Sequence, residues 1–90
     1  AVMYRVVWLH AALSELAAAW QEAESAQRQR ITAATHFIEH DLRSDPASKG
    51  ESRAHDHRIH FYATLAITFE VLPTRLTVRV LHVWTFREKN

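Results

Sequence analysis

The sequence contains no cysteine, one glycine and two prolines among its 90 residues. Without cysteine there can be no disulfide, thiolate metal ligand or thiol nucleophile, a pattern typical of a reducing compartment. So few turn-forming residues disfavour a sandwich or barrel of many short strands. No run approaches the roughly 18 apolar residues that a membrane span needs, and no signal-peptide pattern is present. We therefore expect a cytoplasmic protein without a membrane partner.

The composition is that of a globular chain, with 48% hydrophobic and 23% charged residues. The length predicts one domain over residues 1–90 with a thin core. The net charge is only +1, but residues 1–45 carry −2 and residues 46–90 carry +3, together with four of the seven histidines. Any anion-binding surface is therefore expected in the second half of the chain.

Hydrophobic periodicity in the first half predicts a short strand followed by two helices. Tyr4–Trp8 is a β-branched and aromatic run that favours a strand. From His10 to Ser25 the spacing is helical, with one apolar stripe formed by Leu9, Leu13, Leu16, Ala17 and Trp20. A second helix is expected over 26–43, with a stripe formed by Ile31, Ala34, Thr35, Ile38 and Leu42. The short connection predicts an antiparallel hairpin in which the two stripes face each other.

The second half begins with a long polar segment. Residues 43–57 contain no large apolar side chain, and a loop of this length in a small domain is functional or mobile. Three strands are then expected, over Arg58–Tyr62, Leu65–Leu72 and Leu76–Trp84, with Pro73-Thr74 as a hairpin turn.

This β-α-α-β-β-β order predicts an α+β fold, in which a four-stranded antiparallel sheet carries the helical hairpin on one face. The opposite face is left open, and alternation places Thr68, Leu81 and Val83 there.

Two histidine clusters suggest metal sites. His36 and His40 flank Glu39 in an H-x-x-E-H pattern, the inverted zinc-protease signature. A catalytic zinc needs a third ligand and a larger scaffold, and the helical wheel places both histidines on the solvent face. An adventitious surface pair is therefore favoured, and a metal-dependent hydrolase is a third alternative. We predict no metal and no cofactor.

The second cluster, His55, His57 and His60, lies beside Arg53 and Arg58. It is open to three interpretations: a metal site, a solvated loop, or contact with an anion such as RNA.

The third candidate site is cationic. Arginines can hold phosphates through bidentate hydrogen bonds, and the candidates for this role are Arg53, Arg58, Arg79 and Arg87. His82 or His60 can exchange a proton with a ribose 2′-hydroxyl or a leaving 5′-oxygen. Together these groups suffice for metal-free RNA cleavage.

Each of these residues also has a structural interpretation. Arg79 can pair with an acid such as Glu70, and His82 can be a half-buried histidine. Trp84 can stack on a base or pack as an ordinary sheet aromatic.

Several stretches, in the same order, resemble the RelE/ParE superfamily of bacterial toxins. They are Arg5-Val6-Val7-Trp8, Leu13-Ser14-Glu15-Leu16 with Trp20, Leu42-Arg43-Ser44-Asp45-Pro46, Gly50-Glu51-Ser52-Arg53, Arg58-Ile59-His60-Phe61, and residues 77–84. The resemblance implies the fold derived above and a toxin neutralised by a wrapping antitoxin. It also implies one of two activities, cleavage of mRNA on the ribosome or poisoning of DNA gyrase.

From these observations we expect a type II toxin that acts as a metal-free, ribosome-dependent mRNA endoribonuclease and arrests growth. The catalytic candidates are Arg58, Arg79, His82 and Arg87, and the substrate-binding candidates are Arg53, His60 and Trp84. The alternative is a gyrase inhibitor or a non-catalytic antitoxin-binding protein. It is favoured by two departures from the family pattern. Ala66 stands where RelE-type cleavers carry an arginine, and Thr85-Phe86 stands where ParE-like chains carry His-Gly.

Overall fold

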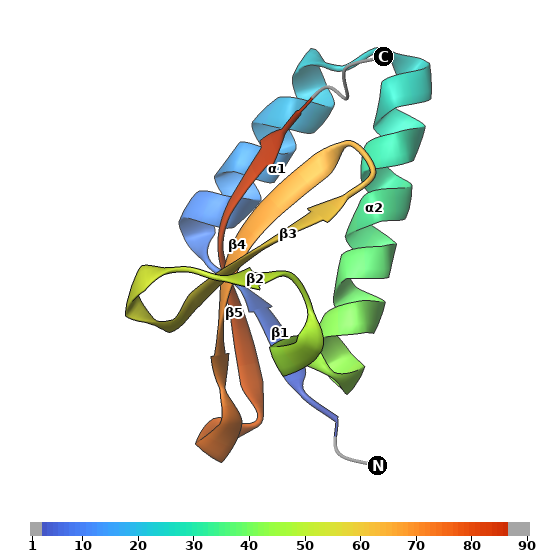
Figure 1. Ribbon diagram of the computed structural model, residues 1–90. Coiled ribbons are helices and arrows are strands. Elements are labelled where there is room, and N and C mark those ends of the chain that lie inside the picture. The colour runs from blue at the N-terminus through green and yellow to red at the C-terminus, as the bar shows by residue number, and fades with distance from the viewer. Residues whose placement is uncertain (1–2, 87–90) are drawn as a thin grey trace.

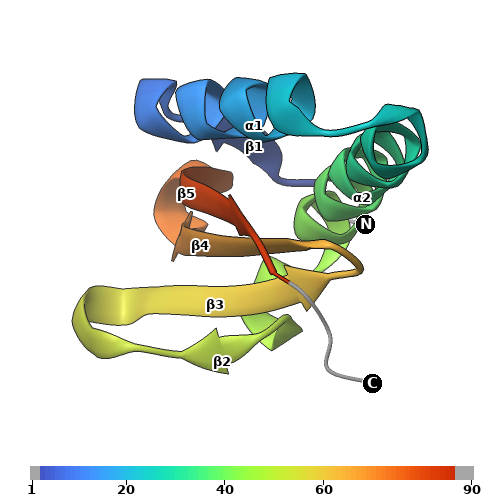
Figure 2. The same ribbon diagram turned by 90° about the horizontal axis from the view of Figure 1, so that it is seen from above.

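The computed structural model describes residues 3–86, which form two helices and five strands (Figure 1). The elements are β1 (Arg5–Trp8), α1 (His10–Glu22), α2 (Ser25–Ser44), β2 (Glu51–Ser52), β3 (His57–Tyr62), β4 (Leu65–Leu72) and β5 (Thr77–Thr85). Figure 2 shows both helices on the same side of a strongly twisted sheet, which confirms the predicted α+β architecture. Neither helix is long and apolar enough to cross a membrane.

The sheet has the order β1-β5-β4-β3-β2 and differs from the expected one in two ways. The polar segment 43–57 contains the two-residue strand β2, which pairs antiparallel with β3 and adds a fifth strand. In addition, β1 is parallel to β5, with Arg5 opposite Thr77 and Trp8 opposite Val80. Parallel neighbours need a long crossover connection. The two helices carry the chain from β1 at one edge of the sheet to β2 at the other, and β3, β4 and β5 then return to β1.

The core lies between α2 and the two long strands β4 and β5. The buried stripe of α2 consists of Ile31, Ala34, Ile38 and Leu42, each at most 2% exposed. It faces alternate residues of the sheet, which are Leu65, Ile67, Phe69, Val78, Val80 and Val83. The alternation predicted for β4 is therefore confirmed, and α2 with β4 and β5 forms the main core of the protein.

A β-bulge in β5 changes the alternation predicted for that strand. Thr68 pairs with His82 and the next residue, Phe69, pairs with Val80, so that Leu81 is an extra residue. Such a bulge re-aims the side chains that follow it. Val80 and Val83 both enter the core, and Val83 is only 2% exposed. The expectation that Val83 lies on the open face is therefore wrong.

The α1 helix packs on the sheet through Ala12, Leu16 and Ala19. Ala12 is fully buried, and Leu16, Ala19 and Ala23, the residue that follows the helix, pack against the core. Leu13 and Trp20 remain 49% and 43% exposed. The two helices contact each other little. The predicted stripes therefore face each other only in part: Ile31 and Thr35 of α2 lie opposite the α1 stripe, and the rest of the α2 stripe packs on the sheet.

The only glycine positions β2 beside β3. Gly50 has a φ of +68°, a left-handed conformation that favours glycine. Any side chain at this position would also collide with the backbone carbonyl of Ile59. The hairpin that follows projects from the body of the molecule (Figure 1). His55 and Asp56 at its tip both have positive φ.

Candidate functional site

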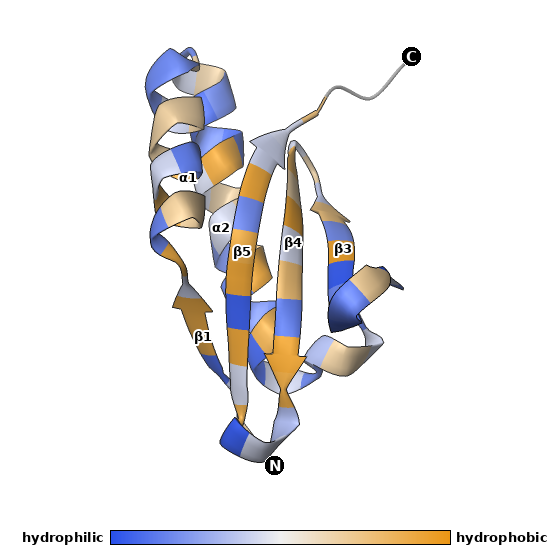
Figure 3. Ribbon diagram, turned by 90° about the vertical axis from the view of Figure 1, so that its left-hand side faces the viewer, coloured by the Kyte–Doolittle hydropathy of each residue, from blue (hydrophilic) through white to orange (hydrophobic). Residues whose placement is uncertain are grey.

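The face of the sheet opposite the helices, here called the open face, carries both charged and aromatic side chains. The register of the strands places on it His57, Ile59 and Phe61 from β3, Ala66, Thr68 and Glu70 from β4, and Arg79, His82 and Trp84 from β5. Figure 3 shows these three strands in front of the helices, with alternating hydrophilic and hydrophobic bands. Two of the four catalytic candidates, Arg79 and His82, therefore share this face.

Arg79 is paired with a carboxylate at the centre of the open face. Nη1 of Arg79 lies 2.9 Å from Oε1 of Glu70, and Nε2 of His57 lies 3.6 Å from Oε2 of the same carboxylate. The side chain of Glu70 is only 19% exposed. These three residues, here called the Glu70 cluster, match the structural interpretation of Arg79, because Glu70 neutralises the guanidinium.

His82 lies at the edge of β5, beside α1. Its Nδ1 is 3.2 Å from Oε1 of Glu15, and the same oxygen accepts a hydrogen bond of 3.2 Å from the backbone N–H of Val83. Strand β1 pairs with β5 only as far as Val80. Glu15 therefore caps the part of the β5 edge that β1 leaves uncovered. His82 itself is 58% exposed at this edge.

Arg58 lies on the core side of the sheet, and each of its three guanidinium nitrogens donates a hydrogen bond. It donates hydrogen bonds to the carbonyls of Lys49 (2.7 Å) and Gly50 (3.0 Å) and to the hydroxyl of Ser52 (2.9 Å). Arg58 and Arg79, both phosphate-binding candidates, therefore lie on opposite faces of the sheet. Arg58 instead fixes the segment that carries β2.

The remaining predicted residues are not brought together. Arg53 pairs with Glu51 at 3.2 Å in the projecting hairpin. His60 faces the core side, with its ring edge-to-face on Tyr62 at 4.3 Å between centroids. Arg87 lies outside the described residues. Among residues 3–86, no group of three His, Cys, Asp or Glu side chains is placed to hold a metal ion.

Burial determines the ionisation of His60 and Tyr62. Desolvation lowers the pKa of His60 below its ordinary value of 6.5; Asp41 raises this pKa and Lys49 lowers it. Burial, reinforced by Asp41, raises the pKa of Tyr62. Within the described residues, the hydroxyl of Tyr62 is buried without a hydrogen-bond partner. Both groups are therefore held mainly neutral at pH 7.

The end of the open face beside the turn between β3 and β4 is aromatic. Phe61 is 56% exposed and Trp84 is 39% exposed, and the ring of Phe61 meets that of Phe86 edge-to-face at 5.2 Å. Ala66 pairs with Phe61 on one side and Trp84 on the other, and it is fully buried. We call Phe61, Trp84 and Phe86 the aromatic patch. Sequence reasoning missed Phe61, although its outward position in an alternating strand was a usable signal.

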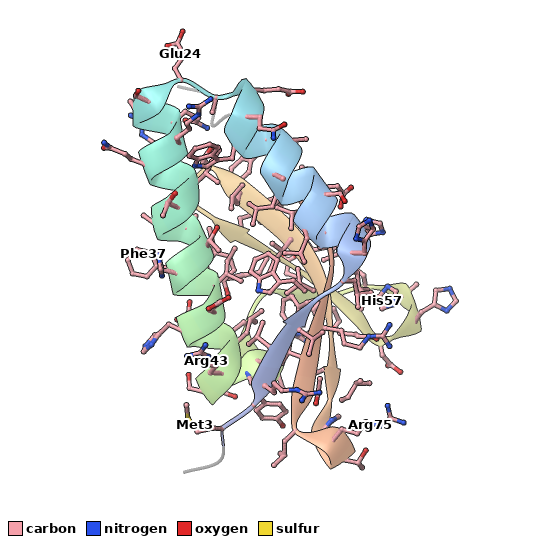
Figure 4. All side chains as sticks on the ribbon, turned by 180° about the vertical axis from the view of Figure 1, so that it is seen from behind. Met3, Glu24, Phe37, Arg43, His57 and Arg75 are labelled. Carbon is pink, nitrogen blue, oxygen red and sulfur yellow. The ribbon has the colours of Figure 1, made fainter. Side chains whose placement is uncertain are left out.

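A second surface lies on the helix side of the molecule (Figure 4). A groove of about 420 Å³ runs between the helices, lined by Leu13, Leu16, Ala17, Trp20, Gln21, Ile31, Thr32, Thr35 and His36. Arg28 of α2 is joined to the end of α1 beside this groove, where it donates hydrogen bonds to the carbonyls of Trp20 (2.9 Å) and Gln21 (3.1 Å). Its guanidinium also lies 4.3 Å from the centre of the Trp20 ring, a cation–π contact. The α1 stripe predicted to be core therefore lines an apolar surface groove.

Sequence comparison alone does not classify the chain, since no family model and no curated protein sequence matches it. Solved structures do match. The toxin–antitoxin complex RelBE2 of Mycobacterium tuberculosis aligns with a TM-score of 0.76 at 19% identity, over 97% of this chain and 95% of that one. The isolated RelE toxin of Escherichia coli aligns with a TM-score of 0.63 at 17% identity, over 97% and 88%.

A chain of the ParDE system of Pseudomonas aeruginosa aligns with a TM-score of 0.66 at 14% identity, over 94% of this chain and 98% of that one. These alignments span nearly all of each partner and include both RelE and ParE structures. The protein therefore has the RelE/ParE toxin fold, as the sequence resemblance implied.

Replacing Arg58 tests its structural role. Arg58→Ala removes three hydrogen bonds whose donor is charged, and the carbonyls of Lys49 and Gly50 lose this hydrogen-bond partner. The free energy of unfolding should therefore fall by about 1–3 kcal/mol. Urea denaturation followed by circular dichroism measures this change. Arg53→Ala is the matched control, and it should cost less than about 1 kcal/mol because its ion pair is exposed. Equal losses in both variants would contradict the assigned role of Arg58.

The lowered pKa of His60 predicts acid sensitivity. Because burial disfavours the protonated imidazole, the unfolded chain binds a proton more readily than the folded one below pH 6.5. Stability should therefore fall as the pH drops from 7 to 5, and this fall should be shallower in His60→Gln. Urea midpoints at several pH values measure it, with His36→Gln, an exposed histidine of α2, as the control. A pH profile unchanged in His60→Gln would refute this assignment.

Proposed function

We propose that this protein is the toxin of a type II toxin–antitoxin pair and that its antitoxin covers the groove between α1 and α2. The RelE/ParE fold supports the toxin class, because structures of this fold include the toxin–antitoxin complexes RelBE2 and ParDE. The observation that carries the antitoxin proposal is the exposed apolar stripe of α1. Leu13 and Trp20 are about half exposed on a helix whose other face is already packed.

The groove fits an amphipathic segment. Leu13, Leu16 and Trp20 follow one another at helical spacing on one wall, and Ile31 and Thr35 form the other. Apolar anchors at this spacing are how a helix is recognised in a groove. Burying the stripe would remove apolar surface from water, at roughly 25 cal/mol per Å². An antitoxin segment with apolar residues on one face therefore suits this site.

For the toxic activity, the geometry supports binding of a target over cleavage of RNA. The arrangement of the cations supports this choice, because Arg58 lies on the core side and Arg79 is neutralised by Glu70. Ala66 occupies the position where the resemblance implies an arginine, and it is fully buried beside Phe61 and Trp84. Exposed aromatic side chains are enriched at protein–protein interfaces. We therefore propose a non-nucleolytic toxin, with a protein such as gyrase as its target.

The second candidate function is the mRNA cleavage expected from the sequence. It is favoured by Arg79 and His82, which lie three positions apart on the open face of β5. A guanidinium for the phosphate and an imidazole for the proton are the two groups this chemistry needs. In the free protein, however, each has a carboxylate partner, Glu70 or Glu15.

Two neighbouring alanines test the antitoxin site. Ala17 lines the groove and Ala18 does not, although both are exposed on α1. Ala17→Asp places a charge in the apolar groove and should weaken antitoxin binding roughly tenfold or more, because that carboxylate loses its water in the complex. Titration calorimetry with the protein encoded beside this chain measures the affinity. Ala18→Asp should bind like the unchanged toxin, and equal affinity of both variants would exclude the groove.

Expression and two enzyme assays test the activity. The unchanged protein should arrest growth, leave mRNA uncut on translating ribosomes, and inhibit DNA supercoiling by gyrase. Trp84→Ala should relieve the arrest at least partly, because it removes an anchor of the aromatic patch. New mRNA ends that disappear in Arg79→Ala would instead select the ribonuclease, and normal growth with both assays negative would exclude a toxin.

A further inference from the structure

Basic and acidic side chains alternate across neighbouring strands of the open face. Arg79 on β5 is followed by Glu70 on β4 and His57 on β3, and then by the ion pair between Arg53 and Glu51. Glu70 is the least exposed member of its cluster, with 19% of its side chain exposed against 41% for Arg79 and 36% for His57. Each oxygen of this carboxylate is directed at a different partner.

We propose that Glu70 is a specificity-determining residue that keeps polyanions off the open face. Its carboxylate occupies the position at which a phosphate would meet Arg79 and His57. The face thereby accepts a protein surface and rejects RNA. This inference rests on the proposed non-nucleolytic function and names the residue that enforces it.

The geometry gives the physical reason. A phosphate that approaches Arg79 must either displace Glu70 or lie beside it. Displacement leaves a largely buried carboxylate without its strongest partner, and coexistence places two negative charges together. Arg79 consequently contributes no net charge toward a nucleic acid, whose binding depends on the number of phosphates that the protein neutralises.

The surroundings of the cluster do not offset this effect. Arg53 is paired with Glu51 at 3.2 Å, so the adjacent hairpin adds no net charge through these two residues. The ring of His55, in the same hairpin, lies 6.4 Å from that of His57. Figure 4 shows His57 on the side of the molecule away from Phe37 of α2. Toward the other end of the same face lie Ile59 and the aromatic patch, which a protein partner can bury.

The test measures the binding of a short single-stranded RNA to variants at Glu70. Glu70→Gln keeps the shape of the side chain, removes its charge and frees Arg79. RNA should then bind roughly tenfold more tightly at low salt, and the log–log salt dependence should steepen by about one phosphate contact. Glu22→Gln, at an exposed carboxylate of α1, makes the same change in net charge on another surface. It should change binding at least severalfold less.

Two further variants keep the inference falsifiable. Glu70→Asp retains the charge and should not gain RNA affinity, and the double variant with Glu70→Gln and Arg79→Ala should lose the gain. Circular dichroism confirms that each variant is folded. Equal effects of Glu70→Gln and Glu22→Gln, or a gain that persists without Arg79, would overturn the role of Glu70. Failure of the proposed function is a separate outcome, seen as mRNA cleavage by the unchanged protein.

Discussion

The parallel pairing of β1 with β5 is the constraint on which the rest of the structure depends. It places the first strand beside the last, so the helices must carry the chain to β2 at the far edge before β3, β4 and β5 return toward β1. The pairing ends at Val80, where the backbone N–H of Leu9 donates to the carbonyl of Val80 at 3.0 Å. Helix α1 begins at the next residue and runs beside the remaining edge of β5, where Glu15 takes over the uncovered backbone donor of Val83.

This arrangement determines which face of α1 is buried. The face of α1 turned to the strands is formed by the small side chains of Ala12 and Ala19 together with Leu16, and Ala23 continues it past the end of the helix. Leu13 and Trp20 are turned toward α2, which covers them only in part, with Arg28 over the Trp20 ring. The same β5 strand carries Arg79 and Trp84 on the opposite side of the sheet. The fold thus presents two separate surfaces, an apolar groove and a charged and aromatic face.

Most elements could be predicted from periodicity, because α2 and β4 each have one clearly apolar face. The bounds of Leu65–Leu72 match the prediction in full, and those of the three other predicted strands, β1, β3 and β5, lie within one residue of it. Three features could not be predicted. Alternation does not reveal a bulge such as that at Leu81, an apolar stripe does not say whether it faces a core or a partner, and a two-residue strand has no period.

The site was less predictable for the same physical reason. A guanidinium can bind a phosphate, a carboxylate or a set of carbonyls. Which of these it binds depends on the face of the sheet on which the arginine lies. Arg58 and Arg79 are both strand arginines, yet one clamps a loop and the other pairs with Glu70. The sequence allowed the pairing of Arg79 with Glu70 to be named as a structural alternative. It did not allow the side of the sheet on which Arg58 lies to be predicted, because the register of Arg58 with β4 depends on the turn between β3 and β4.

The central claim is that the α1 stripe is a binding surface and not displaced core. Methyl NMR of the protein, titrated with the product of the neighbouring reading frame, tests it most directly. The account predicts that the methyl signals of Leu13, Leu16 and Ile31 shift on binding, whereas that of Ile59 on the open face does not. Shifts at Ile59 with unchanged signals from Leu13 and Leu16 would contradict it.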